Sequence, residues 1–253
     1  MQIDLSGKLV LVTGASGELG RTMARTLAQC GADIAVHYRG NEAKARTLQA
    51  ELEELGRRTV AVQADVTKLD DVLRMKEQIA EQLGTIDIVV ANAVIQYAWT
   101  TVLEQPVEDY VSQFESCVLQ SVHLAKAFVP DMVAQQGGRM IGINTECVMQ
   151  NFPTQSAYVA GKRGMDGVYR ILAKEVGEHQ ITVNQVAPGW TISDKDRDNH
   201  TEQNEGYSQS VPLKRRGTDQ EIANVVAFLA SDLSSFITGA YIPVNGGNVM
   251  PSI

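Results

Sequence analysis

Long apolar stretches are missing from this chain. No run reaches the roughly 18 consecutive apolar residues that a membrane-spanning helix needs. The N-terminus, Met1–Asp4, is short and polar, and the apolar residues after it, Leu5–Val12, are typical of a strand rather than of a signal-peptide core. We therefore expect a cytoplasmic protein without a membrane partner.

Cysteine and histidine are also scarce. The chain has 3 cysteines and 4 histidines. The cysteines are odd in number and lack CxxC spacing, and the histidines lack HExxH spacing. These residues are Cys30, Cys117, Cys147, His37, His123, His179 and His200. Neither a disulfide framework nor a metal site is predicted.

Positive charge is in deficit. Lysine and arginine total 22 against 30 aspartates and glutamates, which gives a net charge of −8. Phosphate contacts need clustered cations, so we expect no nucleic-acid partner. The basic clusters Arg57–Arg58 and Lys214–Arg215–Arg216 are small, and we interpret them as solvated loop charges. Hydrophobic residues at 44% and charged residues at 21% are typical of a soluble globular protein and exclude a disordered or fibrous chain.

Short apolar runs recur along the chain. Most are rich in valine and isoleucine and do not alternate with polar residues, as in parallel strands that are covered on both faces. The runs are Leu9–Val12, Ile34–Tyr38, Val60–Ala64, Ile86–Ala91, Arg139–Asn144, Ile181–Ala187 and Tyr241–Val244. They predict seven parallel strands.

Helical patterns lie between these runs. They are Gly20–Cys30, Glu42–Leu55, Leu69–Leu83, Val107–Gln135, Ser156–Glu178 and Asp219–Ser231. Gly31, Gly56, Gly84 and Gly137 stand where helices end. The alternation predicts an α/β Rossmann fold, a doubly wound seven-stranded parallel sheet with helices on both faces, formed by residues 1–253 as a single domain.

One segment, Trp190–Thr218, is irregular and rich in Asp, Asn, Gln and Ser. It follows a strand at the expected carboxyl edge of the sheet, where open α/β sheets bind ligands. A long loop there is often a substrate lid, and we expect a lid at about 190–218. A loosely ordered connection is the alternative.

A glycine-rich turn joins the first strand to the first helix. Gly14, Gly17 and Gly20 suit a tight turn, close approach of the backbone to phosphate, and helix–strand packing. The N-terminus of the helix then offers N–H groups and the positive end of its dipole to a pyrophosphate. Because the glycines follow the first strand and open the first helix, they favour a dinucleotide site over a purely structural turn.

Two later strand ends carry further candidates for the cofactor site. The second strand ends in Tyr38 followed by Arg39, with no carboxylate to bind the ribose hydroxyls. An arginine suits a 2′-phosphate, so we expect NADP(H) rather than NAD(H), with a plain surface charge as the alternative. At the end of the third strand, Asp65 could accept from an adenine amino group or could cap the next helix.

Tyr158 and Lys162 lie four residues apart in a helical stretch and therefore share one helix face. We expect the Lys162 ammonium to lower the pKa of the Tyr158 phenol from its usual value of about 10. Such a phenol can donate a proton to a carbonyl oxygen or accept one from an alcohol. The spacing alone is a weak signal, and its place after the fifth strand gives it weight.

The sequence resembles the short-chain dehydrogenase/reductase family over essentially its whole length. It is most similar to the single-domain type that includes 3-oxoacyl-[acyl-carrier-protein] reductases. The matching stretches are TGASGELG, AVQADVT, DIVVANA, YVAGK, ITVNQVAPG and ITGAYIPVNGG. The resemblance implies NADPH-dependent reduction of a carbonyl group, reversible as oxidation of an alcohol.

The resemblance also implies residue roles. Tyr158 would be the general acid/base, Lys162 would hold the nicotinamide ribose and tune Tyr158, and Thr145 would orient the carbonyl in place of the family's serine. The implied cofactor-binding residues are Gly14, Ser16, Gly17, Leu19, Arg39, Asp65, Val66, Asn92, Ala93, Tyr158, Lys162, Pro188 and Gly189. A small-molecule carbonyl or alcohol substrate and a homotetramer or homodimer are expected.

The chain departs from the family pattern at the cofactor turn. Glu18 stands where a glycine is usual, and either faces the pyrophosphate or points outward if Gly17 makes the close approach. Arg21 could pair with Glu18 or with the pyrophosphate. Val94 replaces a glycine and would either narrow the cofactor cleft or alter the loop that follows.

Further departures lie near the expected reaction centre and on the surface. Cys117 replaces a helix asparagine that helps to hold a proton-relay water, and a thiol is a poor hydrogen-bond partner. The family's arginines for docking the carrier protein align with Gln136 and His179. Docking of a carrier protein is therefore in doubt, and the substrate could instead be a free small ketone, sugar or quinone-like compound. A second hypothesis is a divergent protein that binds cofactor or partners with little turnover.

The sequence identifies the wall of a substrate pocket only by position. Aromatic and polar side chains follow several strands and are candidates for that wall, with ordinary packing as the alternative. They are Gln96, Tyr97, Trp99, Met149, Phe152, Trp190 and Tyr207.

Overall fold

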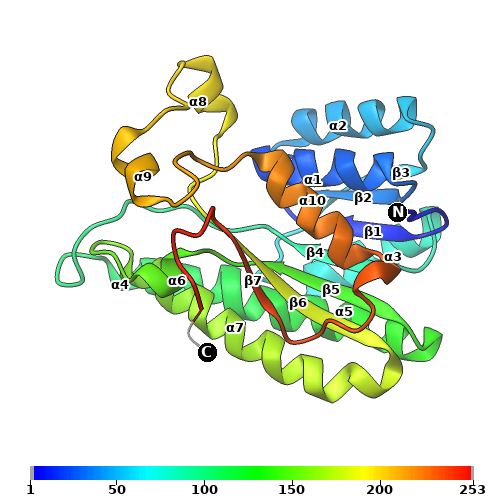
Figure 1. The fold of residues 1–253 in the computed structure, drawn as a ribbon. Helices are drawn as coiled ribbons and strands as arrows, with labels where there is room; N and C mark the ends of the chain where they lie inside the picture. The colour runs from blue at the N-terminus through cyan, green and yellow to red at the C-terminus, as the bar shows by residue number, and fades with distance from the viewer. Residues whose placement is uncertain (1–2, 252–253) are drawn as a thin grey trace.

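The computed structural model describes residues 3–251. Its seven strands form one parallel sheet in the order β3-β2-β1-β4-β5-β6-β7 (Figure 1). The strands are β1 (Leu9–Val12), β2 (Asp33–Tyr38), β3 (Thr59–Gln63), β4 (Ile88–Ala91), β5 (Gly138–Ile143), β6 (Ile181–Pro188) and β7 (Tyr241–Val244). The predicted fold class is confirmed, and the predicted strand bounds are shifted by at most two residues.

Helices cover both faces of the sheet. One face carries α1 (Glu18–Gln29), α2 (Glu42–Glu54) and α10 (Asp219–Ala230), and the other carries α3 (Leu69–Gln82), α5 (Gln120–Gln135) and α7 (Ser156–Val176) (Figure 1). The remaining helices are α4 (Val107–Gln113), α6 (Cys147–Gln150), α8 (Asp194–Asp198) and α9 (Glu205–Ser210). Short 3-10 turns cover Gly177–His179 and Asp232–Ser234.

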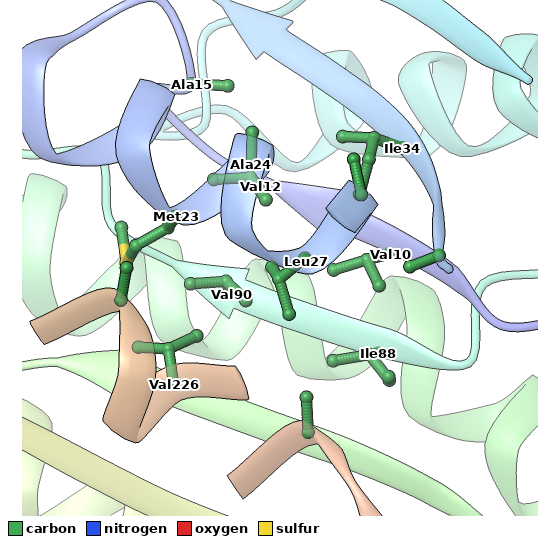
Figure 2. Close-up of a cluster of buried hydrophobic side chains, with 14 of the residues drawn as sticks. Val10, Val12, Ala15, Met23, Ala24, Leu27, Ile34, Ile88, Val90 and Val226 are labelled. Carbon is green, nitrogen blue, oxygen red and sulfur yellow. The ribbon is translucent and has the colours of Figure 1, made fainter. Parts of the chain in front are cut away.

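The two hydrophobic cores explain why the strands read as continuous apolar runs. Successive side chains of a strand point to opposite faces. Val10 and Val12 of β1 pack with Met23 and Leu27 of α1 on one side (Figure 2), whereas Leu11 belongs to the core under α3, α5 and α7. Because helices cover both faces, both sets must be apolar, and the alternation typical of a half-exposed strand is absent.

The predicted helix Val107–Gln135 is interrupted. Residues Phe114–Leu119 form a π-helical turn between α4 and α5. Apolar periodicity did not reveal this turn, because a π-helical turn is a short bulge inside a helix that continues on both sides of it. The end of α5 also differs, because Gln136 rather than Gly137 adopts the left-handed conformation (φ 53°).

The segment 190–218 is more ordered than its composition suggests, since it contains α8 and α9. The prediction of solvated charges in Lys214–Arg215–Arg216 is wrong for Arg216, which is 3% exposed. Its guanidinium pairs with Asp196 at 2.7 Å and packs over the ring of Trp190, 4.5 Å from the centroid. Arg216 therefore holds the α8 half of this segment to the loop before α10.

Candidate active site

A cleft of about 770 Å³ opens at the carboxyl edge of the sheet. The glycine turn, the ends of β2 to β6 and one face of α7 line it. It brings together every residue that the sequence nominated for catalysis or cofactor binding: Gly14, Ser16, Gly17, Leu19, Arg39, Asp65, Val66, Asn92, Ala93, Thr145, Tyr158, Lys162, Pro188 and Gly189. Parallel strands produce this convergence, because all of their carboxyl ends meet at one edge.

The glycine turn is built for close approach. Gly14 has φ +64°, in the left-handed region that favours glycine, and Gly17 is the N-cap of α1. A Cβ on Gly20 would collide with the Gly14 carbonyl oxygen and lie 2.8 Å from Ala15 Cα. Within residues 3–251, no side chain caps α1, so its first N–H groups remain available to an anion. The Gly14–Gly20 turn and the first N–H groups of α1 together form a pyrophosphate cradle, which fits the pyrophosphate of a dinucleotide.

Asn92 ties the end of β4 to the same turn. Its side-chain amide donates to the carbonyls of Thr13 (3.0 Å) and Gly14 (3.3 Å). The Thr13 hydroxyl in turn accepts from the N–H groups of Asn92 (2.9 Å) and Ala93 (3.0 Å). Val94 follows and lines the cleft, as its position predicted.

Glu18 and Arg21 turn toward the 190–218 segment. A Glu18 carboxylate oxygen accepts from the backbone N–H of Asp194 at 3.2 Å, and Arg21 forms an ion pair with the Asp194 side chain. Glu18 therefore engages α8, although it still borders the cleft. Arg21 thus pairs with Asp194 rather than with Glu18. Sequence spacing could not reveal this contact, because it arises where α8 folds over the start of α1.

His37, at the end of β2, is a site residue that the sequence analysis missed. Its ring is buried, with Nδ1 accepting from the Gly14 N–H at 2.9 Å and Nε2 3.1 Å from the Ala64 carbonyl oxygen. The two contacts require the neutral ring with its proton on Nε2. Burial lowers the pKa of His37 to about 4. His37 thus fixes the glycine turn through the hydrogen bond that it accepts from Gly14.

This buried histidine predicts a pH dependence of stability. The folded-state pKa lies below the unfolded value of about 6.5, so its contribution is present above that pH and is lost as pH falls toward 4. The loss between pH 7 and pH 5 should be about 2 kcal/mol. Denaturant unfolding at both pH values measures the free energy of unfolding. Between pH 7 and pH 5 this free energy should fall less in His37→Asn than in the wild type, by about that amount. Equal drops in both proteins would contradict the assignment.

The adenosine end of the cleft holds Arg39 and Asp65. Arg39 is exposed, with its side chain free to meet a ligand phosphate. Asp65 accepts from the Thr67 N–H (3.1 Å) and hydroxyl (2.7 Å), so it forms a local turn ahead of α3. Partial burial acts to raise the pKa of Asp65, but these hydrogen bonds and nearby cations lower it. The carboxylate is therefore an acceptor at neutral pH.

Tyr158 and Lys162 project from the first turns of α7, as their spacing predicted. Lys162 is buried and Tyr158 is partly buried, and Lys162 Nζ lies 5.9 Å from the Tyr158 ring centroid. The expected lowering of the tyrosine pKa is wrong: burial raises the pKa of Tyr158, and the neighbouring Cys147 adds to this. Burial also lowers the pKa of Lys162, whose Nζ donates to the Ile143 carbonyl at 2.6 Å.

Thr145 lies beside Tyr158 on the loop after β5. Both residues line the cleft, and the Thr145 hydroxyl accepts from the Cys147 N–H at 3.2 Å. Asn144 fixes this loop to α7, because its amide donates to the Lys162 carbonyl (3.1 Å) and to Gln185 (2.7 Å). The hydroxyls of Thr145 and Tyr158 therefore face the same point of the cleft from different elements.

Cys117 lies in the π-helical turn and is fully buried, with its sulfur 3.9 Å from Gln113 Oε1. Its neighbour Ser116 is a second residue that the sequence analysis missed. Within the described chain, the buried Ser116 hydroxyl has no hydrogen-bond partner, and Ser116 lines the cleft. Since buried hydroxyls are nearly always bonded, this group fits a polar atom of a bound ligand.

The expected pocket-wall residues fall into two groups. Gln96 lines the cleft, Tyr97 accepts from the Tyr158 N–H at 2.6 Å, and Trp99 stacks on the Tyr158 ring at 6.0 Å between centroids. Of these seven candidates only Gln96 lines the cleft itself; the other six do not: Tyr97, Trp99, Met149, Phe152, Trp190 and Tyr207. Tyr207 contacts the loop after Thr145 instead, where its hydroxyl donates to Glu146.

Between residues 3 and 251, no cluster of three or more His, Cys, Asp or Glu side chains is arranged to hold a metal ion. No helix of that range is long and apolar enough to cross a bilayer.

Comparison with known proteins agrees with this geometry. The family described as Enoyl-(Acyl carrier protein) reductase matches residues 14–248. The chain belongs to the short-chain dehydrogenase/reductase family. A 3-oxoacyl-[acyl-carrier-protein] reductase of Staphylococcus epidermidis is 37% identical over 245 residues, covering 96% of this chain and 99% of the relative.

Other relatives of this short-chain dehydrogenase/reductase act on different molecules. An L-rhamnose 1-dehydrogenase (NAD(P)(+)) of Sphingomonas sp. strain SKA58 is 32% identical and covers 96% of each chain. A promiscuous reductase described as catalysing keto-reduction at C1 during lugdunomycin biosynthesis superposes with a TM-score of 0.90 at 34% identity, covering 97% of this chain and 99% of that one. The predicted family and enzyme class, an oxidoreductase of CH–OH and C=O groups, are confirmed.

Proposed function

We propose that this short-chain dehydrogenase/reductase is an NADPH-dependent carbonyl reductase, reversible as an alcohol dehydrogenase. The observation that carries the proposal is that Thr145 and Tyr158 line the same cleft as the glycine turn, with Lys162 on the next turn of α7. Residues 1–253 would act as one NAD(P)-binding domain with a lid at 190–218. A cytoplasmic location stays a prediction.

Different residues of the cleft would bind different parts of the cofactor. The Gly14–Gly20 turn and the start of α1 would hold the pyrophosphate, Arg39 a 2′-phosphate, and Asp65 with Val66 the adenine. Asn92, Ala93, Lys162 and Pro188–Gly189 would border the nicotinamide half. When bound, the nicotinamide supplies or takes up the hydride.

Proton transfer belongs to Tyr158. Thr145 and Tyr158 would both donate to the carbonyl oxygen, and the Tyr158 proton moves to that oxygen as the carbonyl carbon gains a hydride. The Lys162 charge offsets the phenolate that remains, and a proton from solvent restores the phenol. Because burial raises the pKa of Tyr158, the phenol is protonated at neutral pH, which is the form that reduction needs.

The substrate is better described by its class than by a name. A 3-oxoacyl substrate is the analogy offered by the Staphylococcus relative. Against a carrier-bound substrate, the positions of the family's docking arginines hold Gln136 and His179, whose side chains lie 3.1 Å apart. We therefore favour a small free carbonyl compound.

Cofactor choice is tested by binding. Arg39→Ala should weaken NADPH binding about tenfold or more, since a hydrogen bond to a charged group contributes about 1.5–3 kcal/mol. NADH binding should change less than twofold. Nicotinamide fluorescence titration measures both. Arg46→Ala is the matched control, because Arg46 is an exposed arginine on α2 that pairs with Glu42. An unchanged preference for NADPH in Arg39→Ala would contradict the role of Arg39, and no binding of either cofactor by the wild type would contradict the proposed function.

Self-association is part of the proposal. Exposed apolar side chains lie on α4, the π-helical turn and α7: Val107, Val111, Phe114 and Ile171. Such a surface suits a second copy of the chain in a homodimer or homotetramer. Light scattering after size exclusion gives the mass, and a monomer would reject this part of the proposal.

A further inference from the structure

Glu146 is a buried carboxylate directly after Thr145. It is 3% exposed, and none of the ion pairs formed by the described residues includes it. Burial raises its pKa, while hydrogen bonds from neutral side chains oppose the rise. An apolar residue would be cheaper to bury at this place, so the carboxylate needs a reason.

Three segments of the chain contact Glu146, two through its side chain and one through its backbone N–H. The Tyr207 hydroxyl on α9 donates to Glu146 Oε1 at 2.9 Å. The Asn248 amide, near the C-terminus, lies 3.2 Å and 3.1 Å from the two carboxylate oxygens. The Glu146 N–H donates to the Pro188 carbonyl at 2.9 Å. Glu146 thus joins the Thr145 loop to α9, to the end of β6 and to the C-terminal segment.

Tyr207 is held from a second direction. Its hydroxyl accepts from the Trp190 N–H at 2.8 Å, and it lies against Gly189, where a Cβ would come within 2.5 Å of it. Since Gly189 lines the cleft, the Glu146–Tyr207 pair sits immediately behind the cleft wall. The order of this wall therefore depends on a hydrogen bond that Glu146 accepts.

The two halves of the 190–218 lid are anchored differently. The α8 half is held by the pair of Arg216 with Asp196 and by Asp194 on Arg21. The α9 half contacts the body of the protein through Tyr207 on Glu146, Ser210 on Asn248 and Val211 against Gly246. A change at Glu146 removes the first of these contacts and should therefore loosen α9 and leave α8 in place.

We propose that Glu146 is a positioning residue, which holds α9 and the C-terminal segment against the loop that carries Thr145 and so shapes the substrate side of the cleft. It acts through Tyr207 and Asn248 and does not touch the reacting atoms. This role of Glu146 does not depend on the proposed cofactor or on the proposed reaction.

Hydrogen exchange of the full-length protein, without cofactor or substrate, tests the proposal. In Glu146→Ala, exchange of the Ser208 and Val211 amides, bonded to the carbonyls of Asn204 and Tyr207, should accelerate at least tenfold. The amides of α8 should stay within twofold of the wild type. Tyr207→Phe should also accelerate exchange in α9, and the effect of the double variant should be smaller than the sum of the two, because the hydrogen bond between Tyr207 and Glu146 is lost in both single variants.

Two controls separate positioning from a general loss of stability. Glu146→Gln keeps an oxygen that can accept from Tyr207, so it should restore most of the protection of α9. Glu175→Ala, an exposed glutamate on α7, should change neither half of the lid. Unchanged exchange of α9 in Glu146→Ala would overturn the proposal. So would equal acceleration in α8, α9 and the sheet, which would mark Glu146 as a general structural residue.

Discussion

Tyr158→Phe is expected to lower kcat for carbonyl reduction by about 10²- to 10⁴-fold, the range that a positioned general acid supplies. Phenylalanine keeps the ring that stacks on Trp99 and removes only the hydroxyl. The dissociation constant of NADPH should stay within about threefold of the wild type, since the pyrophosphate cradle is formed by other residues. Steady-state kinetics with a ketone accepted by the wild type, together with a fluorescence titration, measure both quantities.

Tyr110→Phe is the matched control for this experiment. The Tyr110 hydroxyl is also bonded to a side-chain hydroxyl, that of Ser156 at 2.6 Å, but Tyr110 does not line the cleft. Its loss should leave kcat within about threefold of the wild type. If Tyr158→Phe retained a similar rate, the proton would have to come from another donor, and the proposed mechanism would be rejected.

The fold could be predicted because its signals are local. Both faces of the sheet are covered, so each strand appears as a short apolar run, and each helix shows its own spacing of buried residues. Met23 and Leu27 of α1, for example, are both fully buried. The π-helical turn at Phe114–Leu119 escaped detection, since it alters hydrogen bonding without changing the residue pattern.

The candidate site could be predicted where function constrains a fixed spacing. The three glycines of the turn and the Tyr158–Lys162 pair are such cases, and all five line one cleft. The electrostatics could not be predicted in the same way. The spacing of Tyr158 and Lys162 suggested a lowered tyrosine pKa, but the depth of burial decides the direction and raises it.

The residues that sequence reasoning missed act through long-range contacts. His37 supports a turn 23 residues away, and Glu146 accepts from Tyr207, 61 residues further along the chain. Arg216 looked like one member of a basic loop cluster, yet it is buried between Trp190 and Asp196. One available signal was a charged residue, Glu146, directly beside a candidate catalytic residue.

Gly20→Ala is expected to abolish high-affinity cofactor binding and to destabilise the protein. A methyl group at this position would meet the Gly14 carbonyl oxygen and Ala15 Cα, which are backbone atoms that cannot turn aside. Either α1 moves away from the turn or the turn opens, and in both cases the N–H groups at the start of α1 leave the place where a pyrophosphate would bind. We expect NADPH affinity to fall at least tenfold and the free energy of unfolding by about 1–3 kcal/mol.

The opposing effect is helix propensity, because alanine in a helix is favoured over glycine by about 1 kcal/mol. Gly167→Ala isolates this term, since Gly167 lies on the exposed face of α7 and a Cβ there would meet nothing within 4 Å. Gly167→Ala should raise the midpoint of urea unfolding, whereas Gly20→Ala should lower it. If both variants were stabilised and both kept NADPH affinity, the contact between α1 and the glycine turn would be looser than the structure describes, and the cradle would not be the source of cofactor binding.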